Sequence, residues 1–151
     1  MTSDTFLDLV KTALLAGVPE LVADNVTVWH SGPSDPTEDI QRGIAKCHGV
    51  SALIHDLGGD SDPDDASAPV ILARTAIELY VDTTKRNRTK TPTLRLPASI
   101  RDNIMTTLHA NQTLLDGRHY HMEPRIKGYQ PLADPDYVCY RVTLLSSIYL
   151  L

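Results

Sequence analysis

The sequence predicts an α+β domain, with a mixed or mainly antiparallel sheet of about five strands and two main helices packed on one face. Two segments, 4–16 and 100–115, carry apolar residues at helical spacing. Several other runs alternate apolar and polar residues, as half-buried strands do. The predicted order is helix, strand, short helix, two strands, helix, two strands, and this order favours α+β over a regular βα alternation.

The first expected helix, 4–16, has apolar residues at four-residue intervals: Phe6, Val10 and Leu14. Gly17 follows it, where glycine commonly ends a helix. A short strand is expected over 25–30. After a loop rich in proline and glycine, the pattern predicts a short helix over 40–47 and a strand over 49–57.

The longest expected strand covers 70–82. One set of alternating residues is mainly apolar, namely Thr75, Ile77, Leu79 and Val81. The other set is more polar and comprises Arg74, Ala76, Glu78, Tyr80 and Asp82. The alternation predicts a sheet with one buried face and one wetter face.

The second main helix is expected to begin at Ser99, because Ser99 and Asp102 have the spacing of a capping box. Two strands, 119–129 and 137–150, are then expected to pair antiparallel and close the chain. Apolar residues continue to Leu151, so we expect the carboxyl terminus to dock in the sheet.

The composition of the chain limits the classes of protein to which it can belong. The chain has 151 residues, which suits one domain over 1–151, and its formal net charge of −5 argues against a wholly basic nucleic-acid binder. It has no signal-peptide pattern and no apolar run of about 20 residues, so we expect an intracellular product with no membrane span. Cys47 and Cys139 are too few for a disulfide framework, and Cys139 is expected to be a buried free thiol.

Charge is distributed unevenly about the longest expected strand. The turn before the strand is acidic through Asp60, Asp62, Asp64 and Asp65. The stretch after it, within an expected mobile loop over 83–97, is basic through Lys85, Arg86, Arg88 and Lys90. The two ends of such a strand are about 40 Å apart. We expect these eight residues to contact a partner, most simply the opposite end of another copy of the chain.

No residue pattern predicts catalysis. Asp60, Asp62 and Asp64 are spaced like the start of an EF-hand, but Asp65 replaces the required glycine and Ile71 the required glutamate. His119 and His121 share a strand face and could bind a metal with a third ligand, but we strongly favour the simpler interpretation that they belong to the polar face of a half-exposed strand. The chain lacks nucleotide, zinc-protease and serine-hydrolase motifs. We therefore expect no enzyme activity, no cofactor and no metal.

The element order resembles that of the tail-terminator and minor-tail (tail-completion) proteins of long-tailed bacteriophages. The resemblance rests on an amphipathic first helix, strands flanking an extended loop, and a helix, 100–115, that leads into a terminal hairpin. It implies a non-enzymatic protein that forms a ring, usually a hexamer, at the end of the tail tube or the head–tail junction, beside other tail or head-completion proteins. The implied location is the virion, after synthesis in the host cytoplasm.

Two other hypotheses remain open from the sequence. One is a small metal- or ligand-binding domain or enzyme that uses the His119 and His121 face. The other is a nucleic-acid-binding accessory protein. No aromatic residue is interleaved with the basic stretch, so direct nucleic-acid binding by base stacking is not expected.

Overall fold

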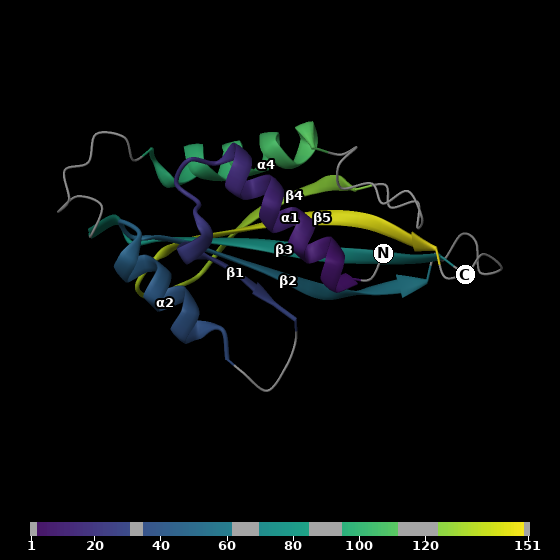
Figure 1. The fold of residues 1–151 in the computed structure, drawn as a ribbon, viewed down its shortest axis with the longest axis horizontal. Helices are drawn as coiled ribbons and strands as arrows, with labels where there is room; N and C mark the ends of the chain where they lie inside the picture. Colours follow the sequence, from purple (N-terminus) through teal and green to yellow (C-terminus); the bar gives the residue numbers. More distant parts are fainter. Residues whose placement is uncertain (1–2, 31–34, 62–69, 85–94, 112–123, 150–151) are drawn as a thin grey trace.

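The computed structural model describes residues 3–30, 35–61, 70–84, 95–111 and 124–149 (Figure 1). The helices with their bounds are α1 (Ser3–Gly17), the short 3-10 helix η1 (Ala23–Asn25), α2 (Thr37–Lys46) and α4 (Pro97–Ala110). The strands are β1 (Val26–Trp29), β2 (Val50–Ser61), β3 (Val70–Val81), β4 (Arg125–Leu132) and β5 (Val138–Tyr149). They form one sheet in the order β1-β2-β3-β5-β4. The predicted α+β fold with a mixed five-stranded sheet is confirmed.

Two crossover connections build the sheet. Strands β1 and β2 are parallel and are joined through α2. Strands β3 and β4 both pair antiparallel with β5, so they run parallel to each other, and α4 lies between them in the chain. Each crossover leads from its first strand toward the β4 edge of the sheet. The strands from which they start, β1 and β3, run in opposite directions. Crossovers of one hand must then place α2 and α4 on opposite faces.

The first face of the sheet carries the main core, beneath α1 and α4 (Figure 1). Alternate residues of the strands point to this face, among them Ile54, Ile77 and Val142, and all three are fully buried. Helix α1 contributes the predicted stripe, and α4 contributes Ile100, Ile104 and Leu108. The prediction of two main helices on one face is confirmed.

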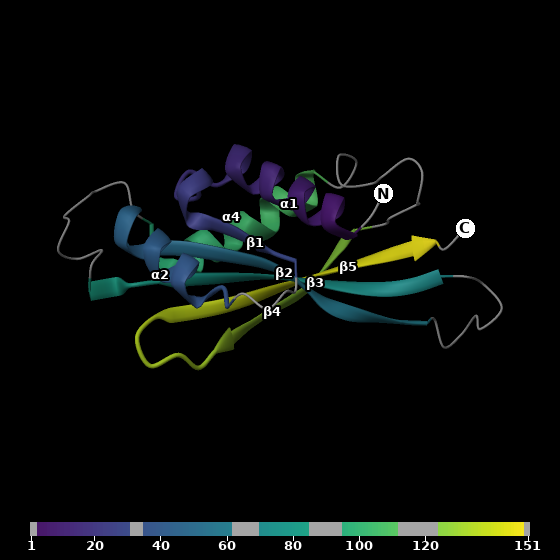
Figure 2. The same cartoon turned by 60° about the horizontal axis from the view of Figure 1, so that its bottom comes forward.

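Among the described helices, only α2 covers the second face, and it does so at one end. Ile40 and Ile44 of α2 pack on Leu53 of β2, with Trp29 and Tyr80 at the edge of this smaller cluster. Figure 2 shows α2 beside β1 and β2, while β2, β3 and β5 extend well past it. The predicted wetter face of β3 is therefore buried near α2, while beyond α2 no described helix covers it and Leu72 and Arg74 are half-buried.

The predicted start of α4 was wrong. The helix begins at Pro97 after an extended Leu96, no side chain caps it, and Ser99 lies inside its first turn. Proline is well suited to the first helical position, because its missing N–H has no partner there in any case. Asp102 instead accepts hydrogen bonds from Arg101.

The last hairpin pairs antiparallel as predicted. Strand β4 continues past the expected end at Tyr129 to Leu132 and includes Pro131. Because β4 is an edge strand, a residue without an N–H is tolerated there. A bulge between Ile126 and Gly128 shifts its register.

Candidate functional site

A cluster of ionisable side chains lies on the second face, where the cover of α2 ends. Its centre is Glu78 of β3, whose side chain is 7% exposed. In the ladder, Glu78 lies opposite Arg141 of β5 and opposite Leu53 of β2. His55 of β2 and Tyr80 of β3 complete the cluster, which is thus assembled from three adjacent strands.

Both carboxylate oxygens of Glu78 accept hydrogen bonds. Arg141 donates to Oε1 from Nη2 at 2.7 Å and from Nε at 3.1 Å. Nε2 of His55 lies 3.1 Å from the same oxygen. The Tyr80 hydroxyl donates to Oε2 at 2.7 Å. A buried carboxylate needs such partners, because removing it from water without them is costly.

The hydrogen bonds determine the charge of Glu78. Burial by itself raises the pKa of a carboxyl group, but the hydrogen bonds from His55, Tyr80 and Arg141 outweigh it and lower the pKa of Glu78 from 4.5 to about 2. The residue is therefore a carboxylate at every physiological pH.

Two neighbours of Glu78, the Tyr80 hydroxyl and the Cys139 thiol, stay protonated and neutral. Burial, followed by the hydrogen bond to Glu78 and its charge, raises the pKa of Tyr80 far above 10. Burial and the Glu78 charge also raise the pKa of Cys139, which lies opposite Tyr80 in the ladder, from 9.0 to about 12. Cys139 is a buried free thiol, as predicted.

These values limit the chemistry of the cluster. A general acid or base works best with a pKa near the working pH, and a cysteine nucleophile requires a lowered pKa. Glu78, Tyr80 and Cys139 are each shifted away from neutrality. The arrangement therefore joins three strands electrostatically, and these three groups are not tuned for proton transfer or nucleophilic attack.

The alternation of residues along β3 placed Glu78 and Tyr80 on one face, but the sequence pattern did not predict this cluster. The sequence held one signal of the cluster: Glu78 is a charged residue among apolar ones in a predicted strand. Arg141 is another charged residue within a predicted strand. The missing information was the pairing of β3 with β5, which brings Glu78 and Arg141 together across 63 positions of sequence.

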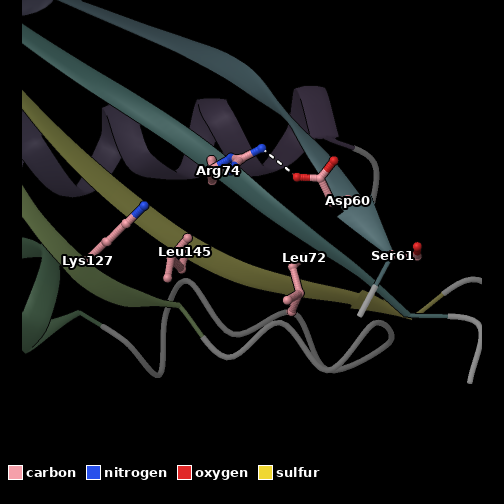
Figure 3. Close-up of a pocket in the computed structure, with 6 residues that line it drawn as sticks. All are labelled: Asp60, Ser61, Leu72, Arg74, Lys127 and Leu145. Carbon is pink, nitrogen blue, oxygen red and sulfur yellow. Dashed lines mark hydrogen bonds and ion pairs between the residues drawn. The ribbon is translucent and has the colours of Figure 1, made fainter. Parts of the chain in front are cut away.

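Beyond the cluster, the open part of the second face holds a groove of about 350 Å³ (Figure 3). Leu72 of β3 and Leu145 of β5 form its apolar floor, and Arg74 and Lys127 stand over it. Nη2 of Arg74 lies 2.7 Å from Oδ2 of Asp60. A smaller groove of about 190 Å³ shares Lys127 and continues along β4 to Gln130.

Of the eight residues predicted to contact a partner, the structure describes Asp60, which lies on β2 at the rim of the groove and pairs with Arg74. The others lie outside the described residues: Asp62, Asp64, Asp65, Lys85, Arg86, Arg88 and Lys90. His119 and His121 also lie outside them. Within the described ranges, no three histidine, cysteine or acidic side chains are grouped as a metal site requires.

The expected mobile loop over 83–97 has one described anchor. Arg95 donates to both carboxylate oxygens of Glu20, from Nε to Oε1 at 2.9 Å and from Nη2 to Oε2 at 3.0 Å. Nη2 of Arg95 also donates to Asn103 of α4. These contacts join the segment before α4 to the segment after α1.

Comparison of the chain with protein-family models and with curated proteins gave no match. In the part of the chain that the structure describes, no helix combines the length and the apolar character needed to cross a membrane.

Proposed function

We propose that this chain is a non-enzymatic structural protein of a tailed phage or prophage, which assembles into a ring at the tail end or the head–tail junction. The observation that carries the proposal is the part of the second sheet face that no described helix covers. Strands β2, β3 and β5 are each 12 residues long, and in the part of the chain that the structure describes, α2 covers one end of them. A sheet face with a half-buried apolar floor, here Leu72 and Leu145, is a natural surface for association between copies.

Two further observations support the proposal. The ionisable groups at the centre of the cluster are satisfied internally and shifted away from neutral pKa values, which favours a structural role over catalysis. The order of elements also fits the tail-protein resemblance, since α1 begins the chain, the long strands β2 and β3 form a hairpin, and α4 leads into the β4–β5 hairpin.

The proposal is tested in particles. We expect the protein to co-purify with phage or tail particles from a host that carries the gene, at several copies per tail, as measured by quantitative mass spectrometry. Neighbouring genes for capsid, portal and tape-measure proteins provide an independent check. Particles that lack the protein while the gene is expressed would contradict the proposal.

A further inference from the structure

Among the described residues, the groove on the second face has more positive than negative side chains. Arg74 is compensated by Asp60, but no ion pair joins Lys127 to any described residue. Arg125 of β4 lies opposite Leu145 in the ladder, is exposed, and adds a third cation at this end of the face. Of the side chains that the structure describes, three cations and one carboxylate surround the apolar floor of Leu72 and Leu145. The groove therefore suits a partner surface that is acidic and partly apolar.

The turn between β4 and β5 has this complementary character. Oδ1 of Asp134 accepts hydrogen bonds from the backbone N–H groups of Asp136 and Tyr137, at 2.9 and 3.0 Å, and this holds the turn in one shape. Burial and then the charges of Asp136, Asp82 and Asp134 raise the pKa of Tyr137, so three carboxylates gather here. Val138, at the start of β5, is 36% exposed and supplies an apolar contact.

The turn and the groove cannot meet within one molecule. Both include β5, but Val138 begins this strand and Leu145 lies seven residues further along it, which is roughly 23 Å. A contact between the two surfaces must therefore join two copies, head to tail. A contact of this kind closes into a ring where the rotation between copies allows it.

We propose that the β4–β5 turn of one copy, residues 133–138, docks into the groove around Lys127 of the next copy. Lys127 would pair with Asp136, while Val138 would cover the floor formed by Leu72 and Leu145. This inference rests on the proposed function for the existence of a ring. It extends that proposal by naming the two surfaces that join neighbouring copies.

Charge reversal tests the contact. The variants are Lys127→Glu and Asp136→Lys, together with the double variant. We expect each single variant to weaken self-association about tenfold at low salt, because it places like charges opposite each other. The double variant, and a 1:1 mixture of the two single variants, should recover the association. Sedimentation velocity measures all of these.

Lys11→Glu and Asp8→Lys serve as controls with the same change of charge, since both residues lie on α1, which packs on the first face of the sheet, opposite the groove. Circular dichroism and melting temperature verify folding of every variant. The inference is overturned if the unmodified chain is a monomer at high concentration and low salt, if the single variants associate like the unmodified chain, or if the double variant fails to recover. Presence of the unmodified protein in tail particles is measured separately, so the contact can fail while the proposed function stands.

Discussion

Arg141 of β5 donates two hydrogen bonds to Glu78, which lies directly opposite it on β3. The arginine side chain is 27% exposed and the glutamate side chain 7%. Arg141 therefore contacts solvent while Glu78 is buried, and the pair lies where α2 ends its contact with the second face. It holds the two central strands in register beside the open groove.

Replacing Glu78 by glutamine should destabilise the fold. The substitution keeps the shape but removes the charge that Arg141 and His55 face, and we expect the free energy of unfolding to fall by about 2 kcal/mol. Urea denaturation at pH 7 measures it. Asp102→Asn is the matched control, because Asp102 is exposed and its one ion pair among the described residues is with the adjacent Arg101. It should change stability by no more than about 0.5 kcal/mol. Equal effects of the two substitutions would contradict the structural role of Glu78.

Stability should depend on pH through Glu78. Its pKa is about 2 in the folded protein and ordinarily 4.5. Because the folded value is the lower one, the stabilisation is fully present above pH 4.5 and is lost as the pH falls towards 2. Denaturation curves at pH 7, 4 and 3 should show a steeper loss for the unmodified protein than for Glu78→Gln. Identical slopes would show that the carboxyl group titrates normally.

Cys139 should resist alkylation in the folded protein. It is 3% exposed, and burial together with the charge of Glu78 raises its pKa to about 12, so little thiolate exists at pH 8. Iodoacetamide should label half-buried Cys47 first and Cys139 only after denaturation. The Cys47→Ser variant provides the control, since peptide mass spectrometry should detect almost no label on it without denaturant. Fast labelling of native Cys47→Ser would contradict the burial of Cys139.

Gly17 should not tolerate a side chain. It ends α1 against α4, and a Cβ atom there would lie 2.4 Å from Cγ2 of Thr107. Because Thr107 is buried and branched, we expect Gly17→Ala to cost about 1–3 kcal/mol.

The double variant Gly17→Ala, Thr107→Ala tests this cause. Removing the threonine methyl and hydroxyl groups makes room, so the two changes together should cost less than the sum of the single changes. Thermal denaturation of the four proteins measures the coupling. Strict additivity would show that the alanine at position 17 is destabilising for another reason.

The sequence by itself determined the class of fold and most elements. Periodicity located α1, β3 and β5, because an apolar stripe or an alternation is a local property of the chain. It failed at the start of α4, where the spacing of Ser99 and Asp102 imitates a cap while Pro97 begins the helix. The two local signals compete, and the helix begins at Pro97, because a proline without an N–H is well suited to the first helical position.

Only the tertiary structure decided what the second face does. In the sequence, Glu78 is only one polar residue of a predicted strand. The pairing of β2, β3 and β5 brings His55 and Arg141 to it. The groove likewise exists because the bulged edge strand β4 places Lys127 beside Leu145. Such contacts depend on strand order and register, which arise from long-range packing and leave no periodic signal in the sequence.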